Sequence, residues 1–232
     1  MKRLMILSAA LLISASTLSA QNLTLGGRYS NYSTSFEFLE TGRASSVGAV
    51  GEYRAGLFVL NGRYDHDFDS GISFDFLPID LAQFSRDRGE VAIGFAVLPF
   101  LDIVGGGRVE ELRLESASFF GDRLFDDTFS LDHTALMFGA SVHSRSIRPI
   151  GWYGNFRGYA GEAEYTVEGL GLTSDTTGYS LEVGFPIPVG LSGWEVTPGA
   201  EFENIEFKDD LALDLNFETN RFFVNLSYSF GR

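Results

Sequence analysis

The stretch RFFVNLSYSFGR, residues 221–232, alternates between two kinds of side chain over most of its length. Side chains two residues apart lie on the same face of a β-strand. One face is therefore polar for the most part, and the other is apolar and uncharged, comprising Phe222, Val224, Leu226, Tyr228 and Phe230. Such a strand either covers a soluble core or faces lipid.

The position of this strand resembles that of the C-terminal strand of bacterial outer-membrane β-barrels, which usually ends in Phe. Here Gly231 and Arg232 follow Phe230, which departs from the usual ending. The resemblance is to this class of barrels and not to one named family. It implies insertion by the barrel assembly machinery and contact with outer-membrane lipid and lipopolysaccharide.

The N-terminus has the order of a secretory signal peptide. Lys2 and Arg3 precede an apolar run, and small residues lead to Ala20. We predict a signal peptide over residues 1–20 and a single outer-membrane β-barrel domain over residues 21–232. No later apolar run approaches the roughly 18 residues of a transmembrane helix. A chain that spans a membrane after export therefore has to do so as a closed barrel.

The composition fits an exported barrel. The chain has no Cys, which excludes a lipoprotein attachment site and a disulfide framework. Aromatic residues make up 14% of the 232 residues, and the formal net charge is −14. This acidity argues against nucleic acid as a partner, because nucleic-acid binding needs a basic surface.

Period-two alternation predicts an all-β fold, an up-and-down antiparallel transmembrane barrel of ten strands. Eight or twelve strands remain alternatives because strand boundaries are the weakest part of such a prediction. The predicted strands are Asn22–Tyr32, Ala44–Tyr53, Leu57–Phe68, Gly89–Leu98, Asp102–Ser116, Thr128–His143, Ile150–Thr166, Thr176–Phe185, Trp194–Phe207 and Glu218–Phe230.

The predicted connections alternate in length, as periplasmic turns and extracellular loops do in such barrels. The short ones are Arg54–Gly56, Pro99–Leu101, Ser144–Pro149 and Pro186–Gly193. The longer ones are Ser33–Arg43, Asp69–Arg88, Ala117–Asp127, Val167–Asp175 and Lys208–Phe217.

A recurring arginine marks the polar face of four strands. Gly-Gly-Arg-Tyr, Asn-Gly-Arg-Tyr, Gly-Gly-Arg-Val and Asn-Phe-Arg-Gly each place an Arg opposite the apolar series. We predict a layer of charge at one level inside the barrel, in which Glu201 replaces the Arg of the ninth strand. Small residues on intervening strands, such as Gly48 and Ser180, leave room for long side chains. The predicted members are Arg28, Arg63, Arg108, Arg157, Glu201, Glu52 and Glu182.

Two functions are compatible with this charge layer. A lumen filled by Arg–Glu pairs gives a closed barrel with a structural or surface-interaction role. A narrow, porin-like channel for small anionic solutes would instead use the arginines as a selective ring. Ten strands favour the closed barrel, because wide aqueous channels occur nearer sixteen strands.

Signals for chemistry are weak. His66 and His133 lie beside Asp residues near an outer rim, and Asp and His at this rim resemble the omptin proteases, which are ten-stranded barrels. The two histidines have opposite parity and no omptin motif is present, so an outer-rim hydrolase is the least favoured hypothesis. We predict no cofactor and no metal motif. Acidic loops could hold divalent cations, with candidates Asp122, Asp126, Asp127, Asp132, Asp209, Asp210 and Asp214.

The C-terminal strand provides the first test. Replacing Phe230 and Tyr228 together with Ser removes the aromatic end of the lipid-facing series and should impair barrel insertion. Heat-modifiable migration on gels reports the folded barrel. Normal amounts of heat-modifiable protein in this double variant would contradict the assignment of this strand.

Overall fold

The computed structural model describes residues 22–36, 39–68, 71–73, 80–119, 122–125, 129–144, 151–167, 170–190, 193–208 and 215–230. The predicted signal peptide lies outside them. All regular elements are strands: β1 Asn22–Phe36, β2 Leu39–Ala55, β3 Phe58–Phe68, β4 Gly71–Ser73, β5 Asp80–Leu98, β6 Leu101–Phe119, β7 Asp122–Phe125, β8 Phe129–Ser144, β9 Trp152–Val167, β10 Leu170–Gly184, β11 Ile187–Val189, β12 Trp194–Lys208 and β13 Leu215–Phe230.

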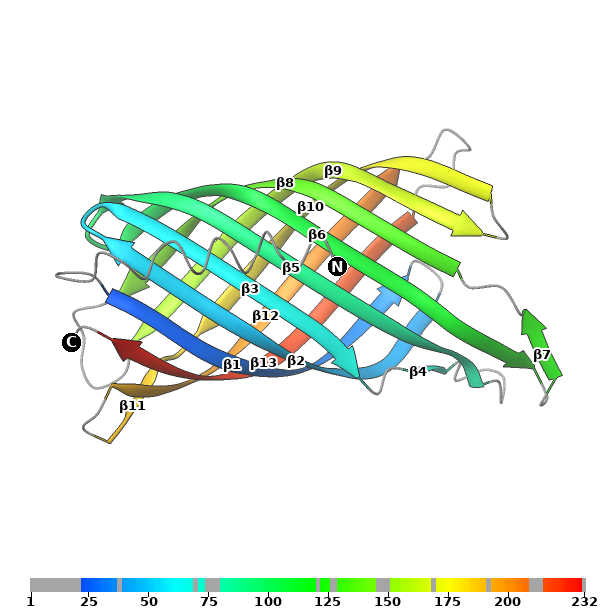
Figure 1. Ribbon diagram of the computed structural model, residues 1–232, viewed down its shortest axis with the longest axis horizontal. Coiled ribbons are helices and arrows are strands. Elements are labelled where there is room, and N and C mark those ends of the chain that lie inside the picture. Colours follow the sequence, from blue (N-terminus) through cyan, green and yellow to red (C-terminus); the bar gives the residue numbers. More distant parts are fainter. Residues whose placement is uncertain are drawn as a thin grey trace.

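Ten of these strands form a closed antiparallel barrel with up-and-down connectivity (Figure 1), which confirms the predicted fold. Closure occurs where β1 pairs with β13, from Leu23 opposite Phe230 to Phe36 opposite Phe217. In the described part of the chain, the short strands β4, β7 and β11 pair with β5, β6 and β12 respectively. No helix in the described part of the chain is long and apolar enough to cross a membrane.

The two ends of the barrel differ. One end carries the start of β1, the end of β13 and the short turns, and we call it the turn end (Figure 1). The short strands β4 and β7 lie at the opposite end, which we call the hairpin end. At the hairpin end the strands extend further than predicted: the predicted loop Asp69–Arg88 overlaps β5, which begins at Asp80, and β13 begins at Leu215. The apolar/polar alternation used for prediction fails there because charged residues occupy outward positions.

The outer wall is apolar over most of its length. Leu136 is 74% exposed and Phe222 is 72% exposed, although both belong to regular strands. Trp194, Tyr228 and Phe230 make edge-to-face ring contacts at the turn end, where an aromatic girdle is expected. This is the exterior of a barrel that faces lipid.

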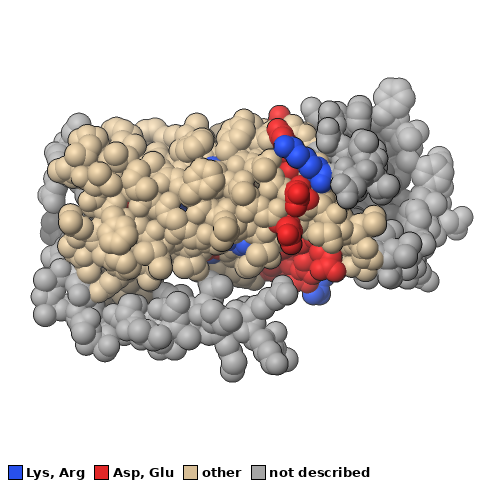
Figure 2. All heavy atoms as spheres, turned by 90° about the horizontal axis from the view of Figure 1, so that it is seen from above, with Lys and Arg blue, Asp and Glu red and all other residues tan. Residues whose placement is uncertain are grey.

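A belt of carboxylates ends the apolar band toward the hairpin end (Figure 2). Asp87, Glu111, Asp132 and Glu164 lie directly opposite one another on β5, β6, β8 and β9. Carboxylates directly opposite each other repel, and they are costly in lipid. The belt therefore marks the level at which the outer wall enters water.

On β6, β8, β9, β12 and β13 the interior becomes apolar near this level. An apolar cluster inside the hairpin end contains Leu131, Ala163, Ile205 and Phe207, against which Leu112, Tyr165 and Phe217 pack. Leu131 directly precedes Asp132, and Ile205 and Phe207 flank the exposed Glu206. The hairpin end is thus built like a water-soluble barrel, with an apolar inside and a charged outside.

This inversion predicts which end is extracellular. Because the chain has no Cys, single Cys residues can be introduced at two exposed positions. Thr173 lies on the outer wall directly opposite the belt residue Glu164, and Leu57 lies in a turn between β2 and β3. An impermeant maleimide should label Thr173→Cys on intact cells and Leu57→Cys only after the cells are opened. The reverse pattern would invert the orientation.

Candidate functional site: the charged lumen

The structure places the four recurring arginines inside the barrel. Arg28 lies on β1, Arg63 on β3, Arg108 on β6 and Arg157 on β9. The first three are buried, Arg108 to 1% exposure, and Arg157 is nearly so. Each belongs to a strand whose alternate residues point outward, so the period-two pattern alone directs these guanidinium groups into the lumen.

Three further arginines join them that the sequence reasoning missed. Arg86 and Arg88 lie on the part of β5 that was assigned to a loop, and Arg221 lies on β13. The signal was present: Arg86 and Arg88 share the parity of the inward residues of β5, and Arg221 shares that of Asn225. Extending the fourth predicted strand backward would have found Arg86 and Arg88. Arg221 already lay in the predicted last strand, on the face opposite the apolar series.

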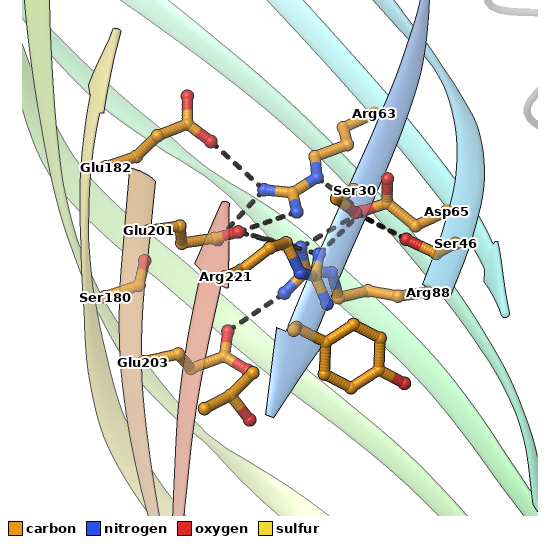
Figure 3. Close-up of polar contacts among 12 residues, drawn as sticks. Ser30, Ser46, Arg63, Asp65, Arg88, Ser180, Glu182, Glu201, Glu203 and Arg221 are labelled. Atoms are coloured by element: carbon orange, nitrogen blue, oxygen red, sulfur yellow. Dashed lines mark hydrogen bonds and ion pairs between the residues drawn. The ribbon is translucent and has the colours of Figure 1, made fainter. Parts of the chain in front are cut away.

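Glu201 is one centre of the ion-pair network (Figure 3). Arg63 donates from both terminal nitrogens to the two Glu201 oxygens, at 2.9 and 2.8 Å. Arg88 donates to the same carboxylate at 3.3 Å and Arg28 at 3.4 Å. The Arg63 contact is bidentate, which is the strongest form of an Arg–carboxylate pair.

Glu203, two residues along β12, is the second centre. Arg88 donates to it at 3.1 Å and Arg86 at 3.2 Å, and Arg108 binds both of its oxygens. Arg88 therefore bridges Glu201 and Glu203. Both carboxylates belong to one strand, while their arginine partners come from strands on other sides of the barrel, so the network crosses the lumen.

Asp65 is a third centre of the network and links β3, β5 and β13. Its Oδ2 accepts hydrogen bonds from Arg63 at 2.6 Å, Arg88 at 3.0 Å and Arg221 at 3.2 Å. Gly48 lies opposite Asp65 on β2. A Cβ at Gly48 would lie 2.6 Å from Asp65 Oδ1 and 2.2 Å from the carbonyl oxygen of Tyr64. The absence of a side chain there gives the Asp65 carboxylate its place.

The remaining predicted acidic members differ in position. Glu182 accepts hydrogen bonds from Arg28 at 2.9 Å and Arg63 at 3.3 Å, and therefore belongs to the network. Glu52 lies nearer the turn end, where it accepts a hydrogen bond from Arg54 at 2.6 Å. Its parity is inward as expected, but its level along the barrel axis is lower than that of the Glu201 layer.

The charges of this central network balance. Among the described residues it contains seven arginines and seven carboxylates, one of which, Asp67, accepts a hydrogen bond from the Tyr32 hydroxyl. Arg54 forms a separate group with Glu52 and Asp102 nearer the turn end. Unpaired buried charges are very costly, and pairing offsets that cost. The members are Arg28, Arg63, Arg86, Arg88, Arg108, Arg157, Arg221, Asp65, Asp67, Glu90, Glu110, Glu182, Glu201 and Glu203.

The two rim candidates His66 and His133 do not converge. His133 is buried inside the barrel, where its Nε2 lies 2.9 Å from the Thr176 hydroxyl oxygen. His66 is exposed on the outer wall, with Nδ1 2.9 Å from Asp87 Oδ1. The two side chains thus lie on opposite sides of the wall. No cluster of three or more His, Asp or Glu suited to a metal ion occurs in the described residues. Of the predicted loop carboxylates, Asp126, Asp127, Asp209, Asp210 and Asp214 lie outside those residues.

Comparison with known proteins shows the fold. No family model matches the chain, and no curated protein does. The outer membrane protease OmpT from Escherichia coli is similar over 94% of this chain and 100% of its own, with 11% identity and a TM-score of 0.56. This chain has the fold of a bacterial outer-membrane barrel. That confirms the class-level resemblance, while 11% identity carries no activity across.

Two other solved structures have lower scores. Neisserial surface protein A is matched over 90% of this chain and 97% of its own, with 11% identity and a TM-score of 0.47. The translocator domain of autotransporter NalP from Neisseria meningitidis is matched over 98% and 94%, with 11% identity and a TM-score of 0.48.

The Arg63–Glu201 pair tests the network. Arg63→Ala leaves a buried carboxylate with less compensation, and breaking such a pair costs roughly 3–5 kcal/mol of unfolding free energy. Glu201→Ala should also destabilise. The double variant should lose less than the sum of both single variants, because neighbours in one network are not additive. Thermal unfolding in detergent measures all three.

The matched control is the exposed Arg113–Glu111 pair on the outer wall. Ion pairs in water contribute little, so Arg113→Ala should unfold at nearly the wild-type temperature. An Arg63→Ala variant that unfolds at the wild-type temperature would show that the lumen ion pairs do not stabilise the barrel.

Proposed function

We propose that this protein is an integral outer-membrane barrel with a closed lumen, and that its role is structural or interactive at the cell surface. The observation that carries the proposal is the crossing of the lumen by the network around Glu201 and Glu203. A solute would have to displace bonded guanidinium groups, which is far more costly than passing along a hydrated wall.

A second barrier lies in series with the first. The apolar cluster at the hairpin end joins β6, β8, β9, β12 and β13, with Phe207 and Phe217 ring centroids 4.7 Å apart. Leu112 of this cluster also packs against Tyr32 and Ala44 on β1 and β2. An ion that passed the charged layer would then meet an apolar layer, where dewetting opposes passage.

The anion-channel alternative fits less well. A selective ring needs cations that face water, whereas Arg63, Arg88 and Arg108 are buried and bonded to carboxylates. The seven carboxylates of the network offset its seven arginines, and Arg54 is paired with Glu52 and Asp102, so no net positive potential attracts anions. The hydrolase alternative lacks a convergent group of reactive side chains among the described residues.

The outer wall supports the surface role. The apolar band fits the hydrocarbon of a membrane, and outer-membrane lipid with lipopolysaccharide is the partner we propose for the band and the belt above it. Beyond the belt, the hairpin end has its own apolar core and extends into water. It offers a rigid surface for contacts outside the cell, and the barrel assembly machinery is the proposed route of insertion.

Electrical recording in planar bilayers tests the closed lumen. The wild type should give no conductance steps. The double variant Arg88→Ala with Glu203→Ala weakens only the charged barrier, and Phe207→Ala with Phe217→Ala weakens only the apolar barrier. Each double variant should therefore stay closed, because the other barrier remains. The four substitutions combined should conduct. Stable anion-selective steps from the wild type would favour the channel instead.

A further inference from the structure

Between the charged network and the turn end, the lumen holds a cavity of about 560 Å³. Its roof is formed by network residues, including Arg28, Arg63 and Glu182, and its lining continues to Asn22 and Ser229 at the turn end. We call this cavity the vestibule. It lies in the size range of roughly 300–1,000 Å³ that is typical of small-molecule sites.

Most charged side chains that line the vestibule form ion pairs with one another. Arg28 and Arg63 bind Glu182, Arg157 binds Glu90 and Arg54 binds Glu52. Four arginines and four glutamates line the cavity. A strongly charged guest would therefore have to break existing pairs and would gain no net attraction.

The neutral groups are better placed to bind. The walls carry the amides of Asn61, Asn155 and Asn225 and the hydroxyls of several Ser and Thr residues. Asn225 is only 8% exposed, and its side-chain Oδ1 has no hydrogen-bond partner among the described residues. A buried polar atom without a partner is costly, so a donor from a guest or from water has to supply this bond.

The mouth of the vestibule adds an amphipathic surface. Tyr153 and Pro188 line this part of the cavity. Tyr153 shares the inward parity of Asn155 on β9, and its ring presents an apolar face beside a hydroxyl that donates to Glu182. Alternating apolar and hydroxyl surfaces of this kind suit a sugar ring, which has both along its faces and edges.

We propose that the vestibule binds a neutral, polyhydroxylated solute of mono- or disaccharide size, which enters from the periplasmic side. This inference goes beyond the closed lumen. It needs only the roof and walls of the vestibule, so binding and conductance are tested separately and either can fail without the other.

Saturation-transfer NMR on the purified barrel in lauryldimethylamine oxide tests the proposal, because this detergent has no sugar headgroup to compete. N-acetylglucosamine and maltose are the probes, with glutamate and sulfate as charged comparisons. We expect millimolar binding of at least one sugar and weaker binding of both charged probes. Asn61→Leu with Asn225→Leu should weaken sugar binding about tenfold through two lost hydrogen bonds. Leu226→Ala on the outer wall should leave binding unchanged.

A second variant keeps the test decisive if the double-leucine barrel does not fold. Ser227→Cys places a thiol in the vestibule lining, and the bound sugar should slow its alkylation by iodoacetamide. Thr173→Cys on the outer wall is the matched control and should react at the same rate with and without sugar. Any of three results would overturn the proposal. The first is a sugar signal from the wild type no larger than that from the double-leucine variant, and the second is tighter binding of glutamate or sulfate than of sugar. The third is alkylation of Ser227→Cys at the same rate with and without sugar.

Discussion

Backbone hydrogen bonding in lipid is the constraint on which this structure depends. No water satisfies a free strand edge within hydrocarbon, so β1 has to pair with β13 along its full length. The C-terminal strand consequently serves both faces at once. Its outward side chains cover the closure with apolar groups, while Arg221 reaches Asp65 and Phe223 packs under the guanidinium of Arg28.

The lumen charges fix the register that closure alone would leave open. Sliding one strand by one residue exchanges its two faces. For β5 this would move Arg86 and Arg88 to the outer wall and Asp87 into the lumen. A basic side chain at the lipid midplane costs roughly 2–4 kcal/mol, falling toward the interfaces, and the slipped strand would also lose its bonds to Glu203. The network is therefore a device for specificity as well as for closing the barrel.

The sequence predicted which side of the barrel wall a residue faces better than it predicted the residue's position along the barrel axis. Alternation placed the apolar series that includes Phe222 and Phe230 on one face and the four recurring arginines on the other. The membrane-barrel assignment then made the apolar face the outside. Alternation could not tell which charges meet, because the Arg63–Glu201 pair joins residues 138 apart and depends on the tilt and stagger of the closed barrel. The alternation pattern failed to place Arg86 and Arg88 in a strand for a different reason. The rule that outward residues are apolar holds only in lipid, and Asp87 lies where the wall enters water.

The point of inversion also explains how deeply the barrel sits. Asp87, Glu111, Asp132 and Glu164 form a row of like charges, which is unfavourable even in water. A shift of one residue along a strand moves the wall by about 3.3 Å and would press this row toward hydrocarbon. A shift the other way would expose large apolar residues such as Phe138 to water. Both displacements raise the free energy, so the row of carboxylates and the apolar band together hold the charged network at one depth in the membrane.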